Sequence, residues 1–299
     1  MKILNICRKD YAGVGIKITQ AVNRHTDHSA RHLCTQIHGL GFEHDIATSD
    51  KAQMRKWLHW ADVVNCHVYL RPLAQAGYFP KNLIITWHGT HYRTKTKKCH
   101  ASYRKHKVKK ALCTTADLTK YGFAEWLPTA IPIGKYRKLR RKRTGGKPIV
   151  CQTPPRGRGS AKGHPQGVLK VLGGRKDIDL RVSEKMPHSQ VLRYKAAADV
   201  YIDRFRLGLG VNGLEALAMK IPVIAHAQPE DAACIIREVG YLPYYDAPLS
   251  KLADAVDDLL SNPAVYREHV DRARAYMEGF HAYPVVAAQY AKICAAVAK

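Results

Sequence analysis

Short apolar runs alternate with longer stretches in which apolar residues recur every three or four positions, up to about residue 132. A run that is apolar throughout is typical of a strand buried on both faces, and the longer spacing is typical of a helix with one buried face. This pattern predicts strands at 2–7, 30–36, 61–68 and 82–89, with a helix at 16–24. Strands separated by helices form βαβ units, so a doubly wound parallel sheet is expected.

The same alternation resumes after the charged, glycine-containing stretch 134–148. That stretch has no apolar periodicity, which is typical of a domain boundary. Beyond it the pattern predicts helices at 166–172 and 189–197, and strands at 148–154, 177–183 and 199–204. The tail from Pro263 has helical spacing with a break near Tyr283 and Pro284. Two similar α/β domains facing across a cleft are therefore the expected architecture.

Length and composition fit a folded protein with a substantial core. The chain has 299 residues, 46% of them hydrophobic, and domains usually contain about 100–200 residues. Charge at Lys2 and Arg8 interrupts the N-terminal apolar run, and no run approaches the ~18 apolar residues of a membrane span. We therefore expect no secretory leader, no stable membrane insertion and a cytoplasmic location, in the host cytoplasm if the protein is viral.

The sulfur and imidazole side chains do not follow a metal-binding spacing. The eight cysteines are scattered and include no C-x-x-C pair, so reduced thiols in the core are expected, with neither a disulfide framework nor a zinc site. His25, His28 and His32 are close in sequence, but they span a turn and the next predicted strand rather than one helical face. No metal and no cofactor are expected.

Positive charge is concentrated in one part of the chain. The formal net charge is +25, and residues 93–147 contribute +16 of it, with 18 Lys or Arg against Asp117 and Glu125. Residues 227–299, by contrast, contain 7 basic and 10 acidic residues. Such an excess indicates a polyanionic partner, and nucleic acid, an anionic membrane and an acidic glycan all remain open.

A glycine-rich stretch, RLGLGVNGLEALAMKIPVIA, occupies residues 206–225. It follows a predicted strand and reads as glycine loop, helix and short strand. In an open parallel sheet, ligands bind outside the carboxyl ends of the strands, where glycines let backbone amides approach and helix N-termini favour anions. The stretch is therefore a candidate site for a phosphorylated ligand.

These residues resemble the second domain of retaining GT-B glycosyltransferases, whose motif reads E-G-F-G-L-x-x-L-E-A-M-A-x-G-x-P-V-I-A. The glycines, the glutamate and the P-V-I-A end all fall in register. The stretch PPRGRGSAKG resembles the basic phosphate loop of that family, and ITWHGTHYR resembles its first-domain H-G-T strand end. The passage 111–133 resembles the end of the family's first domain, and 262–293 its final helices.

The resemblance implies a nucleotide-sugar donor site. Glu215 would accept hydrogen bonds from the ribose hydroxyls, and Lys162, with Arg158 or Arg156, would neutralise the leaving diphosphate without a metal. His88 would approach the donor sugar. The remaining donor-binding positions that the resemblance implies are the amides of Gly208, Leu209, Gly210 and Val211, and the turn at Gly13 to Gly15.

One motif position departs from the family. Leu207 stands eight residues before Glu215, where the family has the first glutamate of its E-x7-E pair. A leucine cannot supply the charge-assisted hydrogen bond that a glutamate gives to a sugar hydroxyl. Three interpretations follow: a different sugar, compensation by a residue such as Asp203, or loss of activity.

The basic segment 93–110 directly follows the predicted strand 82–89, so we expect a basic loop at the carboxyl edge of the first sheet. It contains few apolar residues that could enter a membrane interface, and a Lys/Arg surface that follows phosphates is how nucleic acids are held without sequence readout. The acceptor-binding residues expected here are Arg93, Lys95, Lys97, Lys98, Arg104 and Lys105.

Fold resemblance and charge together predict a retaining glycosyltransferase that acts on a hydroxymethylated pyrimidine base in DNA, similar in role to phage enzymes. Such an enzyme must bring a base hydroxyl out of the duplex. The alternatives are a glycosyltransferase for an anionic surface glycan or glycolipid and a catalytically silent nucleic-acid-binding protein. The expected domains are an acceptor-binding domain at 1–142, a nucleotide-sugar-binding domain at 143–280 and a helix at 281–299 that crosses back to the first domain.

Overall fold

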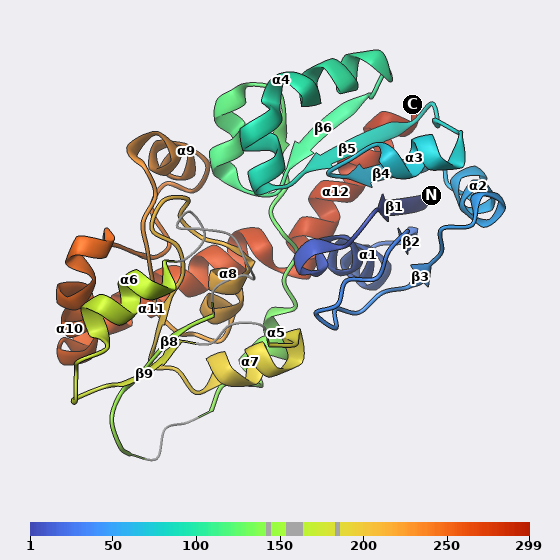
Figure 1. Cartoon of the computed structure of the whole chain (residues 1–299). Helices are drawn as coiled ribbons and strands as arrows, with labels where there is room; N and C mark the ends of the chain where they lie inside the picture. The colour runs from blue at the N-terminus through green and yellow to red at the C-terminus, as the bar shows by residue number, and fades with distance from the viewer. Residues whose placement is uncertain (142–144, 154–163, 183–185) are drawn as a thin grey trace. The chain divides into compact units, whose positions relative to one another are not determined.

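The computed structural model describes residues 1–141, 145–153, 164–182 and 186–299 (Figure 1). The chain divides into two compact units. The first contains Met1–Ala130 together with Phe280–Lys299, and the second contains Ile131–Gly279. Each unit has its own parallel sheet, so the fold is of the α/β class with two Rossmann-like units, as the alternation of strands and helices predicted.

The described part of the first unit contains a seven-stranded sheet in the order β3-β2-β1-β4-β5-β6-β7, and every recorded pair is parallel. The central strands are buried on both faces, which explains their uninterrupted apolar sequences. The strands are β1 (Lys2–Cys7), β2 (Ser29–Cys34), β3 (Ile46–Ala47), β4 (Val63–His67), β5 (Leu83–Trp87), β6 (Lys110–Cys113) and β7 (Glu125–Trp126). The helices are α1 (Val14–His25), α2 (Lys51–Trp60), α3 (Arg71–Ala76) and α4 (Gly89–Lys105).

The last helix, α12 (Tyr283–Ala298), belongs to the first unit and packs against α1. Its buried side chains, among them Val286 and Tyr290, join Ile3 and Ile18 in one hydrophobic core. Figure 1 shows this helix, at the red end of the colour range, beside the blue α1. The expected break near Tyr283 coincides with a short π-helical stretch, Met277–His281, that precedes α12.

The second unit contains a five-stranded parallel sheet in the order β12-β11-β10-β8-β9 among its described residues. Its strands are β8 (Ile149–Gln152), β9 (Asp179–Val182), β10 (Val200–Ile202), β11 (Val223–Ala225) and β12 (Tyr245–Asp246). Its helices are α5 (Ile133–Arg137), α6 (Pro165–Leu172), α7 (His188–Ala196), α8 (Val211–Ala218), α9 (Pro229–Val239), α10 (Leu252–Ser261) and α11 (Pro263–Tyr276).

The first unit ends at Ala130, before the expected boundary at 142. The segment that follows is tied to the second unit: α5 packs on α8, and Arg140 donates through Nη1 to the carbonyls of Ala196 and Ala198 at 3.1 and 2.6 Å. Arg137 pairs with Glu278 at 2.8 Å. Two arginines of the charged stretch 134–148, Arg137 and Arg140, therefore have structural partners, which the charge of that stretch alone did not reveal.

Candidate functional site

Each sheet has a point where the strand order reverses, and such points are where open α/β sheets bind ligands. In the sheet of the first unit, β1 lies between β2 and β4, so the strands that come next in the chain extend to opposite sides of it. In the sheet of the second unit, β8 lies in the same way between β9 and β10. The turn Gly13–Gly15 follows β1, and the loop 203–210 follows β10, so both glycine stretches lie at the predicted kind of position.

The glycine loop of the second unit is held by two side chains that come before it. Asp203, buried at the end of β10, accepts a hydrogen bond from the Gly210 amide at 2.5 Å. Arg204 donates to the carbonyls of Gly208 and Leu209. Gly208 has a left-handed φ of +61°, which favours glycine. Asp203, named above as a possible replacement for the missing glutamate, therefore holds the loop backbone, a role that the motif did not indicate.

The expected sugar-binding amides differ in their availability. The Gly208 amide donates to the His226 carbonyl at 2.9 Å, and the Gly210 amide is taken by Asp203. For the amides of Leu209 and Val211, the described residues supply no acceptor, and Val211 begins α8. Because the first amides of a helix have no acceptor within the helix, Val211 is the donor best placed for an anionic ligand.

Glu215 lies on α8 and is buried, with 1% of its side chain exposed. Its Oε2 pairs with Lys195 Nζ at 2.7 Å, and its Oε1 pairs with His188 Nε2 at 2.8 Å. Lys195 is itself fully buried and also donates to Asn212 Oδ1 at 2.8 Å. A buried carboxylate needs such partners, and sequence reasoning missed Lys195 and His188 because neither lies in the glycine motif.

The neighbouring motif positions have different outcomes. Leu207, the position that departs from the family, forms an antiparallel bridge with Ala227. Lys162, Arg158 and Arg156, expected on the diphosphate, lie outside the described residues.

The first turn of α1 is already capped by a carboxylate. Asp10 accepts from the Gly15 amide and from the Ile16 amide, each at 2.9 Å. A Cβ added at Gly15 would lie 2.5 Å from His32 Nε2, so this glycine is needed for packing on His32. Gly13 has a φ of +64° and begins the helix. Within the expected turn at Gly13 to Gly15, the Gly15 amide is thus taken by the Asp10 side chain, and the Gly13 amide donates to the Asp10 carbonyl at 3.5 Å.

His88 follows β5 and is the N-cap residue of α4. Its Nε2 lies 3.1 Å from His67 Nδ1, and His67 Nε2 lies 3.3 Å from Asn5 Oδ1. Burial lowers the pKa of His88 to about 4, although Asp10 opposes the shift. Burial, together with His88, holds the pKa of His67 well below its ordinary range. Both rings are therefore neutral at physiological pH.

A buried network surrounds the two rings. The Thr19 hydroxyl donates to the Gly15 carbonyl and so accepts from Asn5 Nδ2, both at 2.9 Å. Asn5 Oδ1 is then an acceptor 3.3 Å from His67 Nε2, and Asn65 Nδ2 is a donor 3.4 Å from the same nitrogen, so the network satisfies either tautomer of His67. With the His67 proton on Nε2, its Nδ1 accepts from His88 Nε2–H, and the lone pair of His88 on Nδ1 can accept a hydrogen bond from a ligand hydroxyl.

The basic segment after β5 is a helix, α4, and not the loop that we expected. Lys, Arg and Ala favour helices, and the segment contains no proline. Its inner face packs through Tyr92, which stacks on Trp87 at 4.2 Å between ring centroids, and through the buried Cys99. The outer face exposes Lys95, Lys97, Lys98, Arg104 and Lys105.

Arg93 differs from the other expected acceptor-binding residues. Only 11% of its side chain is exposed, and its Nε donates to Asp117 Oδ2 at 2.8 Å. Asp117 is one of the two acidic residues between 93 and 147, so the charge pattern alone did not reveal this pairing. Arg93 thus anchors α4, whereas the other five residues face solvent.

Along the described stretches of the chain, no helix is both long and apolar enough to cross a bilayer. No protein-family model matches the sequence, and no curated protein matches it significantly.

Solved structures match over the whole chain. A glycosyltransferase from Rickettsia africae ESF-5 is 11% identical, with a TM-score of 0.68 over 100% of this chain and 98% of that one. An alpha-glucosyltransferase in complex with UDP and a 13-mer DNA containing a HMU base is 9% identical, with a TM-score of 0.69 over 99% of each chain. Sucrose-phosphate synthase from Thermosynechococcus elongatus is 12% identical, with a TM-score of 0.65 over 99% of each. The chain therefore has the GT-B fold, built from two Rossmann-like units.

Proposed function

We propose that the protein is a retaining glycosyltransferase that moves a sugar from a nucleotide-sugar to a hydroxymethylated pyrimidine base in DNA. The observation that carries the proposal is the combination of a glycine loop at the switch point of the second sheet with a one-sidedly basic helix, α4, at the carboxyl edge of the first. Among its structural neighbours is an alpha-glucosyltransferase crystallised with UDP-glucose and DNA.

The donor side of the proposal rests on the second unit. The start of α8 supplies the Val211 amide for an anionic or hydroxylated group, and Glu215 supplies carboxylate lone pairs for the ribose. Of the two carboxylate oxygens, Oε1 has the more accessible neighbour, because 15% of the side chain of His188 but none of that of Lys195 is exposed. Departure of the diphosphate would be stabilised by Lys162 and by Arg158 or Arg156, with no metal in the reaction.

His88 would contact the transferred sugar through Nδ1. Because its pKa is lowered to about 4, His88 acts as a neutral acceptor at physiological pH and does not repel a cationic transition state. The hydrogen bond from His88 Nε2–H to His67 Nδ1 would hold the ring in this orientation. The acceptor hydroxyl would attack on the face from which the diphosphate leaves, and its proton would pass to a diphosphate oxygen.

The acceptor side rests on α4. Its five exposed cations, with no acidic residue in the helix, form a surface suited to phosphate contacts. Holding the strand by its phosphates leaves the base edge free to be turned out of the duplex. The helix exposes no large apolar side chain, so the same surface fits a membrane interface poorly.

The test is mass spectrometry of nucleosides from hydroxymethylcytosine- or hydroxymethyluracil-containing DNA incubated with the protein and a panel of nucleotide-sugars. We expect one nucleoside to gain the mass of a sugar. The gain should be lost in Lys162→Ala and kept in Lys170→Ala, an exposed lysine on α6. Glu215→Gln should reduce transfer while the circular dichroism spectrum stays native.

Other outcomes would point to the two alternatives. Tight DNA binding with neither transfer nor donor hydrolysis would indicate a silent binding protein, which Leu207 in place of a glutamate would explain. Retention on anionic vesicles but not on DNA, with transfer to a lipid or glycan acceptor, would indicate a surface-glycan enzyme.

A further inference from the structure

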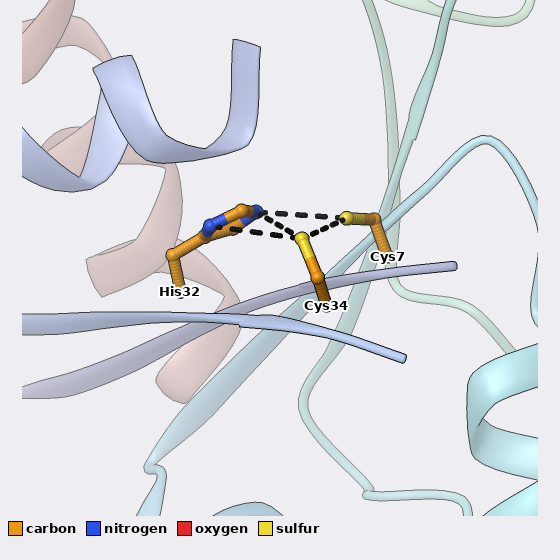
Figure 2. A group of neighbouring side chains, drawn as sticks. All are labelled: Cys7, His32 and Cys34. Atoms are coloured by element: carbon orange, nitrogen blue, oxygen red, sulfur yellow. Dashed lines mark hydrogen bonds between the residues drawn. The ribbon is translucent and has the colours of Figure 1, made fainter. Parts of the chain in front are cut away.

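Three side chains with metal-binding atoms meet at the carboxyl edge of the first sheet (Figure 2). Cys7 is the last residue of β1, Cys34 is the last residue of β2, and the two are direct partners in the parallel register. His32 precedes Cys34 by two residues on β2, so both side chains point to the same face. Strand pairing thus brings together residues that are 27 positions apart.

The three groups are buried and bond mainly with one another. Their exposed fractions are 1% for Cys7, 0% for His32 and 2% for Cys34. The two sulfurs are 3.2 Å apart, and His32 Nε2 lies 3.5 Å from Cys7 Sγ and 3.6 Å from Cys34 Sγ. The only other side chain recorded against these atoms, within the described ranges, is Asp10, whose Oδ2 lies 3.5 Å from Nε2.

We propose that Cys7, His32 and Cys34 bind a structural zinc ion through two thiolates and one imidazole. Thiolate and imidazole are ligands that Zn²⁺ prefers, and structural zinc is four-coordinate, so the fourth position would be taken by the neighbouring Asp10 carboxylate, whose Oδ2 lies 3.5 Å from His32 Nε2, or by a water molecule. The proposal is independent of sugar transfer, in which this ion has no part.

The measured separations fit a tetrahedral ion. Zn–S bonds of about 2.3 Å and Zn–N bonds of about 2.0–2.1 Å give S···N edges of about 3.5–3.6 Å and an S···S edge of about 3.8 Å. Both sulfur–nitrogen distances, 3.5 and 3.6 Å, already have these values. The sulfurs, at 3.2 Å, need to move apart by about 0.6 Å, which side-chain rotation of two residues at strand ends can provide.

Binding of the ion requires only the release of protons. Zn²⁺ replaces the thiol protons of Cys7 and Cys34 and any proton on His32 Nε2, these protons pass to water, and no group is oxidised or reduced.

The ion would connect the carboxyl ends of β1 and β2 close to the first turn of α1. Asp10, next to His32, is bonded by the amides of Gly15 and Ile16, so the site connects to the start of α1. The spacing of the cysteines predicted no zinc site, because no C-x-x-C pair is present. The ligands here come instead from the pairing of two strands, which spacing along one segment does not reveal.

The test measures metal in the full-length protein purified from zinc-supplemented medium. Elemental analysis should find about one zinc per chain, and titration with a mercurial reagent should release it. Replacement by Co²⁺ should give the thiolate charge-transfer and visible bands of a tetrahedral site. Cys7→Ser, Cys34→Ser and His32→Asn should each lose at least most of the metal. Cys113→Ser, a buried cysteine on β6, should keep it.

The cobalt spectrum and the mercurial titration use the unmodified chain, so they decide the question even if a variant fails to fold. Absence of bound zinc and of a thiolate–cobalt band would overturn the proposal. So would rapid conversion of Cys7 and Cys34 to a disulfide by mild oxidant at the same rate with and without added zinc, because a metal-bound pair is protected.

Discussion

The exposed face of α4 allows a quantitative prediction about DNA binding. Lys95→Gln, Lys97→Gln and Lys98→Gln together remove three of the five exposed cations of the helix without touching its buried face. Each phosphate that a cation neutralises contributes about −0.9 to the slope of log K against log salt. If the five cations each contact one phosphate, α4 contributes about −4.5 to the slope, and the triple variant about −1.8.

These slopes translate into measurable losses of affinity. Between 50 and 200 mM salt, five contacts lower the affinity about 500-fold, whereas two contacts lower it about 12-fold. Fluorescence anisotropy of a labelled DNA duplex over this range measures both slopes. The matched control is Lys170→Gln, Lys176→Gln and Lys251→Gln, which removes the same charge from exposed positions in the second unit.

The comparison separates a phosphate-binding helix from a general effect of net charge. We expect the slope of log K against log salt to become less negative by up to about 2.7 in the α4 variant and by much less in the control. An unchanged slope in the α4 variant would refute the assignment of this helix to the nucleic acid. Equal changes in the two variants would show that long-range charge, and not contact, governs binding.

Three further predictions concern stability. Gly15→Ala would place a Cβ 2.5 Å from His32 Nε2. We expect the free energy of unfolding, measured in urea, to fall by about 1–3 kcal/mol, and an unchanged value would contradict the packing described. Glu215→Ala leaves the buried Lys195 without its ion-pair partner, so we expect the free energy of unfolding to fall by about 3–5 kcal/mol. A second change, Lys195→Met, should largely restore it, and the absence of recovery would argue against the ion pair. Burial lowers the pKa of His281 to about 4, so only the unfolded chain takes up this proton between about pH 6.5 and 4. The contribution of His281 to stability should therefore fall by up to about 1.4 kcal/mol per unit as pH drops through this window. His281→Gln should remove this contribution and leave those of His88 and His67, so an equal slope in the two proteins would count against it.

The apolar pattern was sufficient to predict the α/β class and most strands. The runs at 2–7 and 82–89 are buried as β1 and β5 because a strand covered on both faces must be apolar throughout. The two-residue strands β3, β7 and β12 were missed, since two residues carry no period, and the four-residue strand β6 was missed as well. The basic segment was misread as a loop because its charges obscured the two buried positions, Tyr92 and Cys99.

The candidate site was only partly predictable. Glycines after a strand, followed by a helix, mark a switch-point loop, so 208–211 and 13–15 could be located from the sequence. The partners of the polar side chains in the two units could not be predicted from the sequence. Arg93 pairs with Asp117 across 24 residues, and Glu215 pairs with Lys195 across 20.

The sequence by itself therefore determined the α/β class, most of the strands, several of the helices and where the charge is, because these depend on local composition and period. Only the tertiary structure decided which polar groups meet. Asn5 Oδ1 accepts a hydrogen bond from the hydroxyl of Tyr290, which is 285 residues away in the sequence. Cys7 and Cys34 meet because the register of β1 and β2 pairs them. Parallel strands bring the side chains at their carboxyl ends together whatever their separation along the chain, so the chemistry at that edge is set by sheet order and register.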